Sequence, residues 1–325
     1  IWSLSQPPPG YLWLFAFHVP VFFFLTGLTL DPARRSLAAA VRQRARTLLV
    51  PYVCYALLGY LFFVGGYLLA SMLGASLGEF DYGFIIPLLG ILHGTAGNGY
   101  LVNSPLWFLP ALFIAVLLVQ AVCTLTQREG LRAVLIGGVM AAGIAIGDRL
   151  LLPFSLVPAL IGAGFVYIGL LFARDDPMAP ARRPLLWLAL VASAGISLAA
   201  PVNGMVGMAD GSVQQPGLFL LFAINGIALC LLVVRLVPAP VRALLARMGR
   251  HSLEILVLHM LVIKAVKVLM TVVTGRSITV LESSAGAGLV ILAVTAVLLV
   301  PLVWVVRRWL SWTLGRDWGA VRAVA

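Results

Sequence analysis

Long apolar stretches run along the whole chain, separated by short polar connections that are rich in arginine, glycine and proline. A transmembrane helix needs about 20 mostly apolar residues to cross roughly 30 Å of hydrocarbon. Nine stretches approach or reach that length, at about 11–30, 47–73, 105–126, 131–146, 150–173, 184–200, 217–237, 252–274 and 286–306. The apolar stretch 82–92 is too short, which indicates a re-entrant or interfacial segment. The pattern predicts an all-α, polytopic membrane helix bundle with nine spans, and residues 1–325 as a single domain.

The composition excludes a soluble or disordered protein. Hydrophobic residues make up 62% of the chain and charged residues 10%, whereas a soluble domain is about 45–50% apolar and about 25% charged. Disordered segments have low hydrophobicity, which a mean hydropathy of +1.07 contradicts. The three cysteines, Cys54, Cys123 and Cys230, lie in apolar stretches and form no metal-binding spacing. We therefore expect neither a disulfide framework nor a metal site.

Basic residues outnumber acidic ones by 22 to 11, and most of them gather in every second connection. The arginine-rich segments are 31–46, 127–132, 174–183, 235–250 and the tail after residue 306. The connections between them carry only Arg149 and Arg276. Because cytoplasmic loops of membrane proteins carry an excess of Lys and Arg, we predict a multi-pass protein of the cell (inner) membrane with residues 1–10 outside and the C-terminus in the cytoplasm. The same rule accounts for the net charge of +11, so nucleic acid is not an expected partner.

His18 lies inside the first predicted span, in the run FHVPVFFFLTG. An ionisable group at that depth is expensive to place against lipid, which makes it a candidate functional residue. Two interpretations remain open. The residue is either a histidine hydrogen-bonded to a neighbouring helix or a proton-transfer group, for which imidazole is suited by an ordinary pKa near 6.5.

Four more ionisable residues lie in the predicted span 252–274: Glu254, His259, Lys264 and Lys267. Ser252 is a candidate N-cap, and a carboxylate in the first turn complements the helix dipole, so Glu254 has a structural explanation as well as a functional one. His259 lies deeper and has no such explanation. Lys264 is too close to the middle of the membrane to reach the interface easily, so we expect it to face the bundle interior or a wet cavity.

A basic run, Arg42, Arg44 and Arg46, directly precedes the second predicted span. One interpretation is orientation and contact with lipid headgroups, which contributes about 1 kcal/mol per charge. The other is a clamp for phosphate groups, because the guanidinium fork binds phosphate through paired hydrogen bonds.

Four segments follow one another along the chain: FHVPVFFFLTG, RARTLLVPY, PLWFLPALF and HSLEILVLH. Together they resemble the acyltransferase 3 family of membrane-bound saccharide O-acyltransferases, and in particular fucose 4-O-acetylase-like proteins. FHVPVFFFLTG is similar to that family's Phe-His-Met-Pro-Leu-Phe-Phe-Phe-Leu-Ser-Gly signature, with departures at Val19, Val21 and Thr26. Leu28, the next residue, stands where the family usually has tyrosine. RARTLLVPY resembles the basic run leading into Leu-Leu-Ile-Pro-Tyr, and PLWFLPALF resembles the Leu-Trp-Phe-Leu segment that opens a middle helix. HSLEILVLH resembles Ser-Leu-x-Ile-Tyr-x-x-His, with Leu256 in place of the tyrosine.

The resemblance implies a helix before residue 1 that carries a basic residue and, eleven positions later, the histidine thought to act as catalytic base. The full-length protein would then have ten spans, and the chain from residue 1 would be an N-terminally truncated, inactive fragment. In that case His18 would have a supporting catalytic role rather than the main one.

The resemblance also implies a reaction across the membrane. An acyl group, with acetyl as the expected one, would pass from cytoplasmic acyl-CoA to a hydroxyl of an exported saccharide or glycolipid. Acyl-CoA would be a co-substrate, and no bound cofactor is expected. Arg42, Arg44 and Arg46 would hold the CoA phosphates. The residues expected to bind the acceptor are Asn103, Trp107, Glu254, His259 and Lys264.

Two other functions remain open. A lipid-linked-sugar glycosyltransferase would use acidic residues in an outer loop, for which Glu79 and Asp81 are the candidates. A saccharide transporter or exporter would line its path with Lys264 and the histidines. Transfer of label from acyl-CoA to a saccharide would distinguish the acyltransferase from both.

Overall fold

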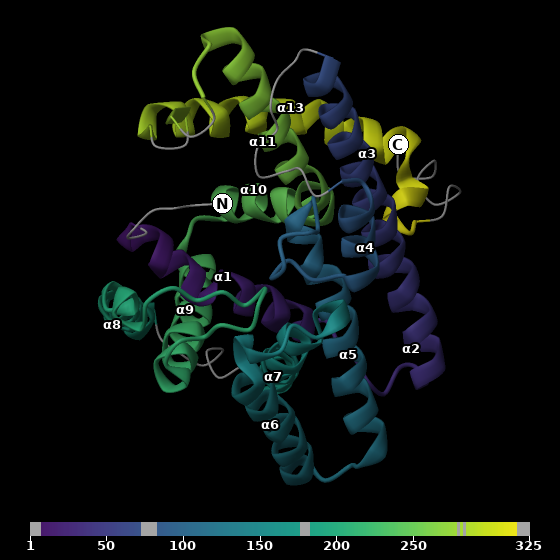
Figure 1. Cartoon of the computed structure of the whole chain (residues 1–325). Coiled ribbons are helices and arrows are strands. Elements are labelled where there is room, and N and C mark those ends of the chain that lie inside the picture. Colours follow the sequence, from purple (N-terminus) through teal and green to yellow (C-terminus); the bar gives the residue numbers. More distant parts are fainter. Residues whose placement is uncertain (1–7, 73–82, 176–182, 278–279, 282–283, 317–325) are drawn as a thin grey trace. The chain divides into compact units, whose positions relative to one another are not determined.

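The computed structural model describes residues 8–72, 83–175, 183–277, 280–281 and 284–316 (Figure 1). These residues are almost entirely helical, and the only β-type pairing among them is an isolated bridge between Gly207 and Ser212.

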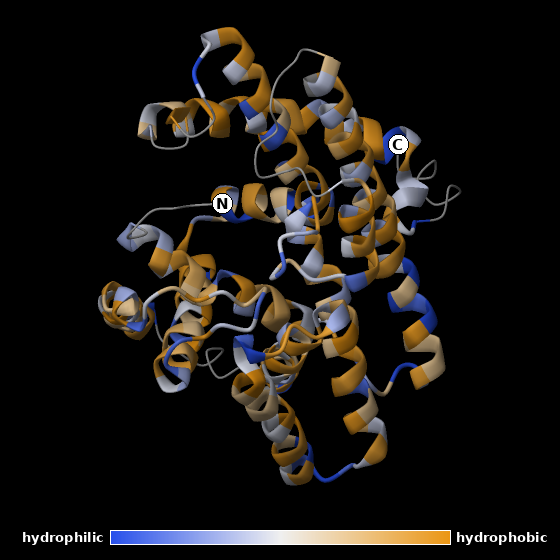
Figure 2. Cartoon of the chain, in the orientation of Figure 1, coloured by the Kyte–Doolittle hydropathy of each residue, from blue (hydrophilic) through white to orange (hydrophobic). Residues whose placement is uncertain are grey.

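Nine helices in the described residues are long and apolar enough to cross a membrane, as the sequence predicts. Their main parts, some of them continued by an adjoining short helix, are α1 (Pro9–Leu28), α3 (Val50–Met72), α5 (Phe108–Leu125), α6 (Glu129–Ile146), α7 (Leu156–Asp175), α8 (Arg183–Leu198), α9 (Pro216–Leu236), α11 (Ser252–Thr274) and α13 (Ala285–Trp309). Figure 2 shows hydrophobic residues along these helices and hydrophilic ones mainly at their connections. The all-α polytopic prediction is therefore confirmed.

Three shorter helices add detail that the hydrophobic pattern did not predict. The stretch expected to be re-entrant or interfacial contains α4 (Ile85–His93). Two arginine-rich segments that we expected to be loops contain α2 (Leu37–Arg44) and α10 (Ala239–Gly249). Both are rich in Leu, Ala and Arg, which have high helix propensity. The charge pattern from which we predict the orientation gives no information on backbone conformation.

Contacts divide the chain into two compact units, each made of two separate parts of the sequence. Unit 1 contains residues 1–43 and 110–245, and unit 2 contains residues 44–109 and 246–325. No single cut of the chain separates them. The single-domain assignment of residues 1–325 stays a prediction.

In unit 1, α1 packs against both α7 and α9. Gly27 of α1 lies against the backbone carbonyl of Val166 in α7, and Gly169 of α7 lies against the carbonyl of Phe24 in α1. Neither position has space for a Cβ atom. Small residues at such crossings let transmembrane helices approach closely and gain van der Waals contact, which replaces the hydrophobic driving force that lipid cannot supply. These glycines allow α1 to pack closely against α7.

In unit 2, α11 packs against α13, α3 and the short 3-10 helix η3 (Ser104–Trp107). Val262 and Val266 of α11 form a buried cluster with Ile291 of α13. The short segment after α13, η7 (Ser311–Leu314), is fastened to α3 by a hydrogen bond of 3.1 Å between the hydroxyls of Thr313 and Tyr55.

Candidate active site

His18 lies in α1, and its Nδ1 atom is 3.0 Å from the carbonyl oxygen of Leu14, one turn earlier. A carbonyl only accepts hydrogen bonds, so Nδ1 carries the proton. In the neutral imidazole this leaves Nε2 with a lone pair. The ring of Phe15 meets the imidazole edge-on at 4.6 Å between centroids. The helix itself therefore engages Nδ1, so a neutral His18 presents Nε2 as its proton acceptor.

His259 in α11 is held in the same way. Its Nδ1 atom lies 2.9 Å from the carbonyl of Ile255 and 3.0 Å from that of Leu256. Nδ1 must again be the donor, and Nε2 remains an acceptor. Helical spacing places the residue on the side of α11 that carries Val262 and Val266, which pack on α13.

Asn103 and Lys264 are brought together by the segment that precedes η3. The Asn103 side-chain amide donates a hydrogen bond of 2.8 Å to the carbonyl of Val257, and Lys264 Nζ donates one of 2.5 Å to the carbonyl of Val102. Asn103 is fully buried, and its Oδ1 atom has no partner among the described residues. Lys264 directs its ammonium onto protein backbone rather than lipid, as its depth in the span led us to expect.

Trp107, the third residue expected beside the acceptor, lies at the end of η3 and is largely buried. Its ring meets Phe108 edge-on at 6.1 Å. Because η3 packs on α11, Trp107 belongs to the same part of unit 2 as Asn103 and Lys264. Its observed contact is hydrophobic packing.

Glu254 belongs to a different group of residues. Its side chain is fully buried, and Oε1 lies 3.0 Å from Arg316 Nη1 and 3.9 Å from Arg307 Nη1. Our capping interpretation of this helix start was wrong. The N-cap is His251, without a side-chain cap hydrogen bond, and Ser252 is the first helical residue. The carboxylate is compensated by distant arginines, which no local sequence pattern could indicate.

His251 completes this group. Arg307 Nη1 lies 2.7 Å from His251 Nδ1, and since a guanidinium only donates, Nδ1 is the acceptor. Burial and the adjacent Arg307 guanidinium lower the pKa of His251 below its ordinary value, with Glu254 acting in the opposite direction. His251 is therefore neutral near pH 7.

The basic run lies on a continuous helical segment and not, as predicted, in a loop. Arg42 lies in α2, Arg44 ends that helix, and Arg46 lies in a π-helical turn, η1 (Ala45–Leu49), that leads into α3. The Val50 N–H group binds the carbonyl of Ala45, five residues back. Pro51 follows directly, and its missing N–H and bulky ring disfavour an ordinary α-turn there. Such wide turns are rare and frequently occur at functional sites.

The acidic pair Glu79 and Asp81, proposed for the glycosyltransferase alternative, lies outside the described residues. Within the described part of the chain, no group of three or more His, Cys, Asp or Glu residues has an arrangement that would hold a metal ion.

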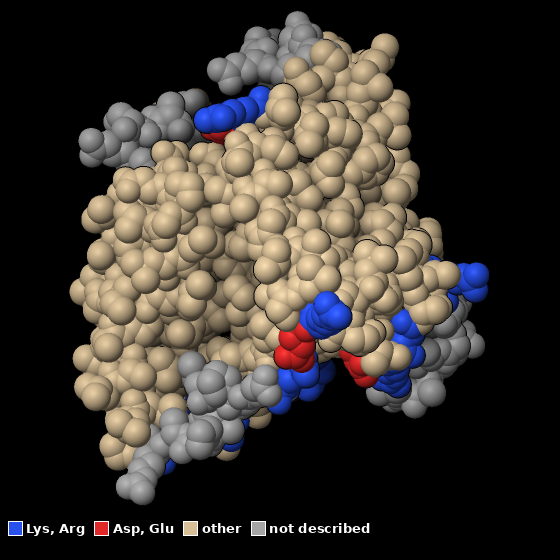
Figure 3. Space-filling model, turned by 90° about the horizontal axis from the view of Figure 1, so that it is seen from below, with Lys and Arg blue, Asp and Glu red and all other residues tan. Residues whose placement is uncertain are grey.

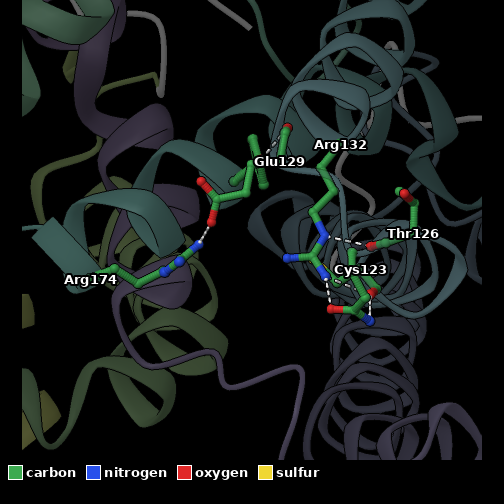
Figure 4. Close-up of polar contacts among 7 residues, drawn as sticks. Cys123, Thr126, Glu129, Arg132 and Arg174 are labelled. Carbon is green, nitrogen blue, oxygen red and sulfur yellow. Dashed lines mark hydrogen bonds and ion pairs between the residues drawn. The ribbon is translucent and has the colours of Figure 1, made fainter.

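Sequence reasoning did not identify one polar cluster, at the turn between α5 and α6 (Figure 4). Arg132 donates to the carbonyls of Thr126 at 2.7 Å and Cys123 at 3.0 Å, at the end of α5, where the last carbonyls have no N–H partner within the helix. Glu129 forms an ion pair with Arg174 of α7. These contacts close a helix end and fasten α6 to α7, so the cluster has a structural role. In Figure 3, too, acidic residues lie beside basic ones in small groups on a mostly uncharged surface.

Comparison with known proteins gives one match. A family model described as an acyltransferase domain, Acyl_transf_3, matches residues 2–308. No curated protein and no solved structure matches the chain. The fucose 4-O-acetylase-like subfamily stays a prediction. The family match covers nearly the whole chain and agrees with its transmembrane helices. The chain therefore belongs to the acyltransferase 3 family and is a multi-pass membrane acyltransferase.

Proposed function

We propose that this membrane acyltransferase moves an acetyl group from cytoplasmic acyl-CoA to a hydroxyl of an exported saccharide or glycolipid. The observation that carries the proposal is the state of His18. Its Nδ1–H group is engaged by the carbonyl of Leu14, and Nε2 is left as a proton acceptor within a transmembrane helix. A neutral imidazole in this tautomer is the form that abstracts a proton from an alcohol.

An acyl thioester is already activated for attack by an alcohol, so the protein does not need to activate the acyl group further. A base removes the hydroxyl proton while the alcohol oxygen forms a bond to the thioester carbonyl carbon. The carbon–sulfur bond then breaks, and the CoA thiolate takes up the proton that the base has accepted. His18 supports this transfer. His259, whose Nε2 atom is also an acceptor, is proposed to bind the acceptor hydroxyls.

For the donor, we assign the CoA phosphates to Arg42, Arg44 and Arg46. Arg42 and Arg46 are exposed and Arg44 is partly buried. Guanidinium groups bind phosphate through charge-assisted, often bidentate hydrogen bonds. For the acceptor, we retain Asn103, Trp107 and Lys264, which are associated with the same part of α11. The Oδ1 atom of Asn103, which has no partner in the described part of the chain, is a buried acceptor able to receive a hydroxyl hydrogen bond.

The decisive experiment supplies radiolabelled acetyl-CoA to membranes that contain the full-length protein and follows the label. We expect label in a saccharide or glycolipid fraction, and none in membranes that lack the protein. Movement of saccharide across the membrane without labelling would favour a transporter. Sugar transfer from a lipid-linked donor, without labelling, would favour a glycosyltransferase.

A further inference from the structure

A second basic cluster lies in unit 2, where α11 begins and α13 ends. At its centre the buried carboxylate of Glu254 faces two guanidinium groups, those of Arg316 and Arg307. The carboxylate is 0% exposed, whereas the arginine side chains are 37% and 41% exposed. Each arginine therefore directs Nη1 toward a buried carboxylate, while the rest of its side chain is partly exposed.

The cluster carries more positive charge than its own carboxylate neutralises. Glu254 supplies one negative charge against two positive ones, and His251 is neutral because its Nδ1 atom accepts from Arg307. Toward the described residues, each guanidinium uses only its Nη1 nitrogen for side-chain contacts. The other N–H donors of both side chains have no partner among the described residues and can bind a further ligand. Burying two charges costs free energy that their mutual attraction often fails to exceed, so stabilisation alone is a weak explanation for this buried ion pair.

The cluster is also joined to the basic run before α3. Gly315 follows η7 with a positive φ of 68°, and its α-carbon lies against the backbone carbonyl of Arg46 with no space for a Cβ atom. The hydrogen bond between Thr313 and Tyr55 fastens the same segment to α3. Arg316 is thus placed next to the π-helical turn that carries Arg46, although the two are distant in sequence.

We propose that Arg307 and Arg316, positioned by Glu254, bind a phosphate group and extend the donor site that begins at Arg46. This inference rests on the proposed function for its ligand, a phosphate of acyl-CoA. Glu254 is a positioning residue that does not itself touch the ligand, which revises its expected place beside the acceptor. An anionic lipid headgroup offers the same phosphate chemistry, so the experiment must separate the two sources.

The direct test measures the binding of CoA to the purified protein in nanodiscs of zwitterionic lipid. Arg316→Gln should weaken CoA binding by at least about tenfold, the size expected for a lost charge-assisted hydrogen bond. Binding of pantetheine, which has no phosphate, should be unchanged. The matched control is Arg308→Gln, because Arg308 lies at the same end of α13 but stacks over Trp309, 5.8 Å from its ring centroid.

A double variant separates binding from folding. Arg316→Gln alone leaves Glu254 buried with less compensation and is expected to destabilise unit 2. Glu254→Gln combined with Arg316→Gln removes both charges, and should restore the unfolding temperature while CoA binding stays weak. Recovery of CoA binding together with stability would overturn the proposal.

The other possible results of these binding measurements also test the proposal. Unchanged CoA binding in Arg316→Gln would overturn the inference even if wild-type membranes transfer label from acetyl-CoA. If Arg316→Gln keeps CoA binding and loses only the stabilisation that anionic lipid in the nanodisc gives the wild type, the phosphate belongs to a headgroup and the donor assignment is wrong. Full-length wild-type protein that binds CoA in an Arg316-dependent way but transfers no label would leave this site intact and refute the proposed reaction.

Discussion

The side-chain amide of Asn103 donates a hydrogen bond to the backbone carbonyl of Val257, 154 residues later in the sequence. Lys264 donates in the opposite direction, from α11 to the carbonyl of Val102. Two reciprocal bonds therefore join the segment before η3 to α11 within unit 2. The Cβ atom of Asn103 also lies close to Gly59 of α3, where an added Cβ would be only 3.1 Å away. The missing side chain of Gly59 thus leaves room for Asn103 beside α3.

We predict that Asn103→Asp destabilises the protein more than Asn103→Ala. Alanine removes one hydrogen bond, at about 0.5–1.5 kcal/mol. Aspartate places a buried carboxylate against a carbonyl that can only accept, which costs about 3 kcal/mol or more. Unfolding temperatures in detergent measure the difference. The control is Asn98→Asp, in the loop after α4, where the side-chain oxygen accepts from Tyr100 N and aspartate keeps that bond. Equal effects of Asp and Ala at position 103 would contradict the buried geometry.

The transmembrane helices could be predicted from the sequence because the bilayer imposes a length and a composition on each span. Helices α2 and α10 could not be predicted in this way, because they are too short and too polar to meet the criteria for a membrane span. In α10, Val241, Leu244, Leu245 and Met248 recur at helical spacing and are all exposed. This stripe opposite the arginines is typical of a helix that lies in the membrane interface. A search for helical periodicity, rather than mean hydropathy, would have found it.

The candidate site was predictable one residue at a time but not as a set of contacts. Depth in a span was enough to single out His18 and Lys264. No local pattern connects Glu254 with Arg316 or Arg46 with Gly315, because those contacts depend on how distant helices pack. The first-turn position of Glu254 instead suggested a local role, through the helix dipole.

For the donor, we predict that replacing Arg44 and Arg46 together by glutamine raises the KM for acyl-CoA by about tenfold or more and leaves kcat nearly unchanged. The reason is the loss of two guanidinium contacts to phosphate in the bound donor. Arg34→Gln, in the exposed turn before α2, is the matched control for a lost cytoplasmic charge. An unchanged KM at normal membrane abundance would return both arginines to contact with lipid headgroups.

The lowered pKa of His251 predicts a pH dependence of stability. Burial and Arg307 are its main causes, with Arg250 and Arg316 acting in the same direction and Glu254 against them. The unfolded state then binds a proton more readily than the folded state, so stability is full above about pH 6.5 and falls as the pH drops toward the lowered folded value. Unfolding temperatures between pH 7.5 and 5 should fall less in His251→Gln than in the wild type. Parallel curves would show that His251 does not contribute.

The orientation of the chain can be tested with two single cysteines in a variant without Cys54, Cys123 and Cys230. Ala39→Cys lies in α2, which we place in the cytoplasm, and Gly97→Cys lies in the loop after α4, which we place outside. Both positions are exposed. A maleimide that does not cross the membrane should label position 97 in intact cells and position 39 only after lysis. The reverse labelling pattern would show that the topology is inverted. The arginines would then lie on the opposite side of the membrane from cytoplasmic acyl-CoA.

His18 allows a sharper separation of catalysis from packing, because an asparagine can reproduce part of its geometry. His18→Asn in the full-length enzyme keeps an N–H donor close to the carbonyl of Leu14 but has no group that accepts a proton at neutral pH. If His18 takes part in proton transfer, both His18→Asn and His18→Ala should lower kcat by about 10²-fold, the lower range for general acid–base catalysis. If it only packs, His18→Ala should act through membrane abundance, at about 0.6–2 kcal/mol of helix association, and His18→Asn should have near-normal turnover per folded molecule. Steady-state kinetics normalised to folded protein distinguishes the two. A fully active His18→Asn variant would show that the hydrogen bond to Leu14, and not the Nε2 lone pair, is what the enzyme requires of this residue.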